Sequence, residues 1–246
     1  MNNSMNKVPD LAPLEEQAET VPAMERLKGV VASAVAKTIF PRMRIYGAEN
    51  LKRLPRPIIL VTAHHSMYDP AIIYGLVKRI HPGVPLGICA EESVNEVWKH
   101  TPFARDIVFV ANDEISVAND RIVPSPLSQV QRQRTRFRAA KAIRKIIEQD
   151  GIIIIQAFGM PKSDNYRRKE PIPGIRGLLE SVLHKKPGAS VVACGMTGGV
   201  APWKDFGNGV GIHQFWKPTE VRISENMNTK DRPMEAIVSE IGKYCQ

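Results

Sequence analysis

Two short, uninterrupted apolar runs constrain the fold of this chain more than any other feature. One spans residues 58–61 after a proline, and the other spans residues 152–155 after the turn-forming pair Asp150 and Gly151. A strand with one face in water alternates apolar and polar residues, whereas a continuous apolar run is typical of a strand that is buried on both faces. We therefore expect both runs to lie inside a sheet that helices cover on both sides.

Helical patterns separate the expected strands along the chain. The sequence predicts strands over residues 43–46, 57–62, 84–89, 107–110, 152–155 and 190–194, helices over 71–80, 93–99, 128–149 and 175–184, and a turn over 47–51. Alternating strands and helices are typical of the α/β class. We predict a single α/β domain over residues 43–246, with a mostly parallel or mixed sheet that is flanked by helices.

The long helix predicted over residues 128–149 combines an apolar row with a basic run. Alternate residues fan around a helix, so the arginines from Arg132 to Arg138 do not form one stripe. A solvated helix surface is the simplest interpretation of such a run. The alternative is docking of an acidic acyl carrier protein, of the diphosphate of coenzyme A or of anionic lipid. The expected buried side of this helix is Val130, Phe137, Ala140, Ile143 and Ile147.

The first part of the chain predicts two segments ahead of the domain. Residues 1–21 are polar and predict a loose tail, and residues 22–42 predict a basic amphipathic helix that packs on the domain or lies on an anionic bilayer. No apolar stretch approaches the roughly 18 residues of a membrane-spanning helix, and the start lacks the features of a secretory signal. We expect a cytoplasmic protein, peripheral on the cytoplasmic face of a membrane.

The overall charge favours anionic partners. The 246 residues include 34 Lys and Arg against 25 Asp and Glu, which gives a formal net charge of +9. Nucleic acid is not an expected partner, because the charge comes without zinc-finger spacing, an RNA-binding motif or many aromatic residues. Three cysteines do not indicate a disulfide scaffold, so a reducing compartment is the better expectation.

A histidine and an aspartate follow the first apolar run. His64 and Asp69 are separated by four residues, and Asp69 with Pro70 is a typical helix start. An imidazole whose far nitrogen contacts a carboxylate can deprotonate a hydroxyl near neutral pH. Two alternatives remain open on these residues alone. Asp69 can be only a helix cap beside a structural His64, or His64, His65 and Asp69 can bind a metal, although no third-ligand motif stands elsewhere.

This segment resembles the opening motif of the glycerolipid acyltransferases typified by lysophosphatidic acid acyltransferase. The hallmark of that family is a histidine, any four residues and an aspartate. His64, Ser66 and Asp69 match it, and Ala63 replaces the usual asparagine. The spacing selects His64 over His65. The resemblance continues in order over roughly residues 43–200.

Two later blocks depart from the family pattern. Residues 111–113 stand where the second block usually ends in an arginine, and residues 156–163 replace the third block, usually Phe-Pro-Glu-Gly-Thr-Arg-Ser. The glutamate of that block is missing. Either a rearranged loop binds a phosphate, or the acceptor carries none, or acyl transfer is weakened. The candidate substrate-binding residues on this resemblance are Ser66, Gly159, Lys162, Ser163, Arg167 and Arg168.

The resemblance implies an O-acyltransferase in phospholipid synthesis, which moves a fatty acyl group onto the hydroxyl of a lysolipid or related lipid alcohol. The donor is a thioester, either acyl coenzyme A or acyl carrier protein, and no metal or other cofactor is implied. His64 is the expected general base and Asp69 its orienting partner. The expected partners are the lipid acceptor, the donor and a membrane surface. The alternatives are lipid binding without turnover and hydrolysis of the thioester.

Overall fold

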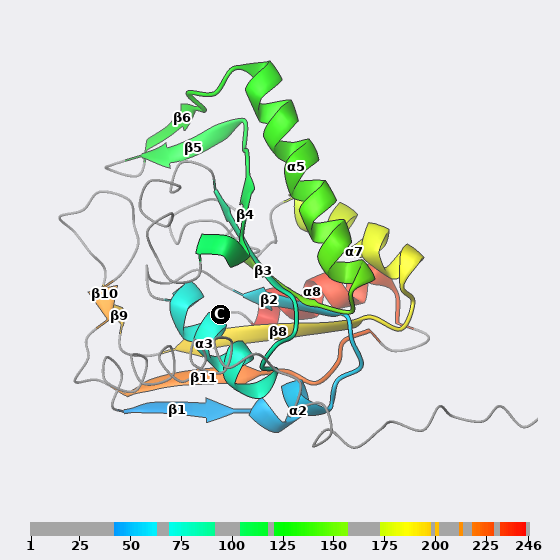
Figure 1. Ribbon diagram of the computed structural model, residues 1–246. Coiled ribbons are helices and arrows are strands. Elements are labelled where there is room, and N and C mark those ends of the chain that lie inside the picture. Colours follow the sequence, from blue (N-terminus) through cyan, green and yellow to red (C-terminus); the bar gives the residue numbers. More distant parts are fainter. Residues whose placement is uncertain are drawn as a thin grey trace, which may run out of the picture.

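The protein has an α/β fold built on one mixed sheet of seven strands (Figure 1). This computed structural model describes residues 42–62, 69–91, 104–117, 121–156, 173–197, 200–201, 212–213, 218–228 and 232–244. The predicted fold class is confirmed. The N-terminal helix predicted over residues 22–42, but for its last residue, and the helix predicted over 93–99 lie outside the described residues.

The sheet has the strand order β1-β11-β8-β2-β7-β3-β4. Its strands are β1 (Met43–Tyr46), β2 (Ile58–Thr62), β3 (Leu86–Glu91), β4 (Ile107–Val110), β7 (Ile152–Gln156), β8 (Ser190–Thr197) and β11 (Thr219–Ile223). From β8 to β4 all neighbours run parallel, whereas β11 pairs antiparallel with β8 and parallel with β1. Two small antiparallel pairs stand apart, namely β5 (Glu114–Val117) with β6 (Arg121–Pro124) and β9 (Val200–Ala201) with β10 (Ile212–His213).

Helices cover both faces of the sheet (Figure 1). One face carries α2 (Ala48–Arg53) and α3 (Asp69–Ile80), and the other carries α5 (Gln129–Glu148), α7 (Pro173–Lys185) and α8 (Met234–Tyr244). The short helix η2 (Ala104–Asp106) leads into β4. None of the described helices is long and apolar enough to cross a membrane.

The two apolar runs occupy the centre of the sheet, as their sequence predicts. In β2, Ile58 and Leu60 belong to the core under α3, whereas Ile59 and Val61 belong to the core under α7 and α8. All four are at most 1% exposed. The paired strand β7 divides its isoleucines in the same way. Alternate residues of a strand point to opposite faces, so a strand between two helical layers requires apolar side chains at every position.

The turn predicted over residues 47–51 is wrong beyond its first residue. Gly47 has the left-handed φ of 78° and begins α2, whose Leu51 is fully buried. A side chain at Gly47 would collide with the carbonyl oxygen of Ile223 on β11. The glycine therefore predicts the backbone turn at residue 47 only. The residues after it form a short helix that buries Leu51 against the sheet.

The predicted buried side of α5 is also wrong in its first half. Val130 is 56% and Phe137 is 73% exposed, and Ala140 is exposed as well. The residues that face the sheet are Ala139, Ile143, Ile146 and Ile147. Successive residues are turned by about 100° around a helix, so Val130 and Phe137 lie on the side of α5 opposite to Ala139 and Ile143. The predicted row therefore combined residues from two sides of the helix, and only its last members face the sheet.

Several other boundaries differ from the sequence predictions. Helix α3 begins at Asp69, and β3 begins two residues later than predicted, at Leu86. Strand β11 and helix α8 were not predicted at all. The alternating burial of β11 shows why, because a strand at the antiparallel side of the sheet needs fewer apolar residues than β2 or β7.

Gly151 makes the tight connection between α5 and β7. Its N–H donates to the carbonyl of Ile146 at 2.8 Å, and its carbonyl accepts from the N–H of Ile58 at 3.1 Å. A Cβ at this position would stand 2.5 Å from Ile146 Cγ2 and 2.6 Å from the carbonyl oxygen of Pro85. The connection therefore has no room for a side chain.

We predict that Gly151→Ala lowers the free energy of unfolding by about 1–3 kcal/mol, the usual range for overpacking. Gly177→Ala is the matched control, because Gly177 lies on α7 with no atom near its missing Cβ. Alanine should raise helix stability there by about 0.5–1 kcal/mol. Urea unfolding of both variants measures the two effects, and equal shifts would contradict the packing at Gly151.

His81 fixes the end of α3 to α2. Its Nε2 lies 2.9 Å from the carbonyl oxygen of Leu51, and a carbonyl only accepts, so Nε2 carries the proton and donates. Burial lowers the pKa of His81 below its usual value, partly opposed by this hydrogen bond, and Arg56 lowers it further. The folded protein therefore holds His81 neutral at a pH where the unfolded chain already binds a proton.

We predict that this histidine makes stability fall as the pH drops below about 6.5, the value for a free histidine. The unfolded state then binds more protons than the folded state, so the free energy of unfolding decreases toward the lowered folded pKa. His81→Gln should show a smaller decrease between pH 7.5 and about pH 5.5 than the wild type in urea titrations. His184→Gln, which removes an exposed histidine, is the control.

Candidate active site

Of the predicted site residues, the described part of the chain includes Asp69 alone. Asp69 is the first residue of α3 and is completely buried. The helix macrodipole stabilises a carboxylate at this end of a helix. The other predicted residues, which lie outside the described residues, are His64, Ser66, Gly159, Lys162, Ser163, Arg167 and Arg168.

The ends of β2 and β7 bring two chain segments to one place. Thr62, the last residue of β2, pairs in parallel register with Gln156, the last residue of β7. The first segment after β2 contains the histidine motif, and the segment after β7 contains the altered third block. Both therefore leave the sheet from adjacent strand ends. In open α/β sheets, ligands bind outside these carboxyl ends of the parallel strands.

Polar side chains at these strand ends share the face on which α3 lies. Ile58 and Leu60 belong to the core under α3, so Thr62, two residues on, points to the same side. The same alternation places Gln156 on that side. Cys194 of β8, which pairs with Thr62 across the other edge of β2, is buried in that core as well. The α3 helix, with its buried N-terminal Asp69, thus covers the face of the sheet to which these polar strand ends point.

Thr62 carries a buried hydroxyl that the described residues leave without a hydrogen bond. The side chain is completely buried, and in the structure as described its Oγ1 has no hydrogen-bond partner. An unsatisfied buried hydroxyl costs about 1–3 kcal/mol, so such groups are rare without a reason. Thr62 and Gln156 were not predicted as site residues. Each is the first polar residue after an apolar strand, and that signal identifies them.

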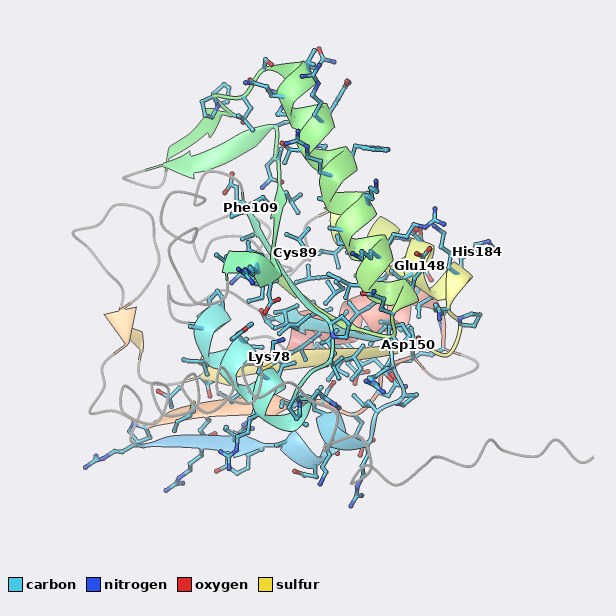
Figure 2. All side chains as sticks on the ribbon, viewed as in Figure 1. Lys78, Cys89, Phe109, Glu148, Asp150 and His184 are labelled. Atoms are coloured by element: carbon cyan, nitrogen blue, oxygen red, sulfur yellow. The ribbon has the colours of Figure 1, made fainter. Side chains whose placement is uncertain are left out.

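A buried polar cluster fixes the position of α3. The Tyr74 hydroxyl donates to Asp106 Oδ2 at 2.8 Å, and Lys78 Nζ lies 3.6 Å from the same oxygen. Lys78 is 4% exposed and also stands 5.8 Å from the centre of the Tyr74 ring (Figure 2). Together with His81 at its other end, these contacts join α3 to η2 and to α2. Asp69 is therefore held on a helix with little freedom to shift.

Cys89 of β3 is a partly buried cysteine whose thiol is held in its protonated form. It lies on the opposite face from Ile88 and packs against the core under α5 and α7 (Figure 2). Burial raises the pKa of its thiol to about 12. A thiolate is the reactive form of cysteine, so Cys89 cannot serve as an acyl carrier at neutral pH.

A second polar cluster lies at the opposite end of the sheet, near the amino ends of the parallel strands. Lys186 Nζ lies 3.1 Å from Asp150, and Arg144 Nε lies 2.6 Å from Glu148, near the C-terminal ends of α5 and α7 (Figure 2). Arg144 lowers the pKa of Glu148, with Lys185 and Lys186 adding to the effect. These groups stand where the parallel strands begin and are exposed, so they are surface ion pairs rather than a binding site.

The described residues contain no group of three His, Cys, Asp or Glu side chains that could hold a metal ion. The expectation that His64 and His65 bind no metal stays a prediction, because both lie outside those residues. No protein-family model matches the sequence, and no curated protein matches it either.

We predict that Cys89 resists alkylation in the folded protein. At pH 8 a thiol with a pKa of about 12 is almost entirely protonated, and Cys89 is also partly buried, which slows the reagent further. Iodoacetamide followed by peptide mass spectrometry should find Cys89 unmodified in buffer and fully modified in urea. Modification in buffer as fast as in urea would contradict the burial of this thiol.

Proposed function

We propose that the protein is an O-acyltransferase of the glycerolipid acyltransferase type. It moves a fatty acyl group from a thioester, acyl coenzyme A or acyl carrier protein, to the hydroxyl of a lysolipid or related lipid alcohol. The observation that carries the proposal is Asp69, a buried carboxylate at the start of α3, beside the strand end from which the His64 segment leaves. A helix cap at the surface needs no such burial.

In the proposed reaction, His64 is the general base. It accepts the proton of the acceptor hydroxyl while the oxygen attacks the thioester carbonyl carbon. The tetrahedral intermediate then collapses, the carbon–sulfur bond breaks, and the thiolate takes the proton back from His64. The products are an ester and a free thiol. Asp69 accepts a hydrogen bond from the other ring nitrogen, which fixes the tautomer of His64 and stabilises the imidazolium.

The remaining assignments concern substrate binding. Gly159, Lys162 and Ser163 follow the end of β7 and are proposed to hold the acceptor or the oxyanion, with Ser66 beside the catalytic pair. Arg167 and Arg168 offer further positive charge for a phosphate. The protein needs no metal for this chemistry. It works as a peripheral protein on the cytoplasmic face of a membrane, where its acceptor resides.

The central prediction is that His64→Ala lowers acyl transfer at least about 100-fold, the usual contribution of a general base. Asp69→Asn keeps the shape of the side chain and removes its charge. It should lower the turnover rate strongly and change the KM for the acceptor much less. His65→Ala is the matched control and should keep most of the activity. Thermal unfolding of each variant separates lost chemistry from lost folding.

The assay uses labelled acyl coenzyme A and acyl carrier protein thioesters with a panel of lysolipids and neutral lipid alcohols. An acylated acceptor that depends on His64 supports the proposal. Bound lipid without any product would instead identify a lipid-binding protein. Free fatty acid that forms equally without acceptor would identify a thioesterase. Full turnover by a folded His64→Ala variant would overturn the assigned base.

A further inference from the structure

The solvent-facing side of α5 is basic and carries an exposed aromatic residue. We call this surface the outer face of α5. Phe137 is 73% exposed and Val130 is 56% exposed, and they lie seven residues apart, on the same side of the helix. Exposed cations surround them. The outer face of α5 consists of Val130, Arg134, Phe137, Arg138, Lys141 and Lys145.

The structure separates the basic residues of α5 into two groups. Arg132 Nε lies 3.1 Å and Arg136 Nη2 lies 2.9 Å from Asp113 Oδ1. Arg136 also donates to the carbonyl of Ala111 at 2.9 Å, and Arg132 donates to the carbonyl of Leu127. These two arginines hold the pKa of the Asp113 carboxyl below its usual value. They attach the helix to the segment after β4 and are structural.

The cations of the outer face differ from these two arginines. Arg144 is not one of them, because its charge is neutralised by Glu148 on the same helix. No carboxylate pairs with Arg134, Arg138, Lys141 or Lys145 in the part of the chain that the structure describes. Arg134 with Arg138 and Lys141 with Lys145 are spaced by four residues, where like charges repel on a helix. The outer face therefore concentrates unpaired positive charge around Phe137 at some cost to the stability of α5.

The outer face begins at the end of α5 that lies toward the carboxyl ends of the parallel strands, where Asp69 stands, and runs from there toward their amino ends. Helix α5 ends where β7 begins, so it runs from the carboxyl ends of the parallel strands to their amino ends. Arg136 reaches the residue directly after β4, and the residues before it extend beyond that strand. Figure 1 shows this end of α5 beside β5 and β6, away from the body of the sheet.

We propose that the outer face of α5 binds the surface of an anionic bilayer, with Phe137 and Val130 entering the headgroup layer. A convex helix with cations beside exposed apolar side chains matches a plane of phosphates above an apolar layer. Each basic residue contributes electrostatic attraction, and Phe137 contributes burial of apolar area. The binding is independent of catalysis. Its role, to bring the active-site edge to a lipid acceptor, rests on the proposed function.

The test measures binding of the full-length protein to vesicles without any acyl donor. The vesicles are phosphatidylcholine with about 30 mol% phosphatidylserine, and pure phosphatidylcholine is the neutral reference. The charge variant replaces Arg134, Arg138, Lys141 and Lys145 by glutamine. We expect its affinity to fall at least about tenfold, because each basic residue near such a surface contributes about fivefold. We also expect its salt dependence to be weaker than that of the wild type.

The matched control carries the same change in charge elsewhere on the surface. It replaces four exposed cations outside α5 by glutamine, namely Lys52, Arg53, Arg79 and Lys243. This variant should keep most of the affinity. Phe137→Ser should lower the affinity about tenfold with an unchanged salt dependence, because it removes apolar burial and no charge. All variants are first compared with the wild type by circular dichroism and thermal unfolding.

Several outcomes would overturn the proposal. One is equal loss of affinity in the charge variant and in the matched control, which would indicate net charge rather than a defined surface. Another is unchanged vesicle binding with lost binding to an acidic acyl carrier protein, which would assign the outer face of α5 to a protein partner. His64→Ala separates the two proposals, since it should bind vesicles like the wild type whether or not acyl transfer exists.

Discussion

Burial of β2 and β7 on both faces is the constraint on which the rest of the structure depends. Ile58 to Val61 and Ile152 to Ile155 contribute to two separate cores at once, one under α3 and one under α5, α7 and α8. Each of these strands needs a helical layer above it and another below it before its side chains leave water. The helical layers on both faces of the sheet answer that requirement.

The same constraint explains what could be predicted from the sequence. The strands β2, β4 and β7 lie within a residue of their predicted bounds, because a continuous apolar run of this length is best explained as a buried strand. Strand β1, in which partly buried and exposed residues alternate, also has its predicted bounds. The apolar residues of α5 were harder to assign. Val130 and Phe137 are seven residues apart and share one side of the helix, but that side faces water, and Ala139 and Ile143 on the opposite side face the sheet. Spacing along one helix does not show which of its two sides the sheet covers.

The candidate site shows a similar division. Asp69 was predicted from a local motif and is buried at the start of a helix beside the carboxyl ends of the strands, and its catalytic role stays a prediction. Thr62 and Gln156 were not predicted, since their proximity depends on the register between two strands that are far apart in the sequence. The cluster of Tyr74, Lys78 and Asp106 depends in the same way on contact between α3 and η2. Local patterns predict single residues, and the topology determines which of them meet.

The connection at Gly151 has a mechanical consequence. Helix α5 passes into the central strand β7 through a turn that is hydrogen-bonded to Ile146 on one side and to Ile58 on the other. Because this joint has neither slack nor space, α5 acts as a rigid arm of the sheet rather than as a hinged flap. The direction in which α5 leaves β7 is thus fixed by a residue without a side chain.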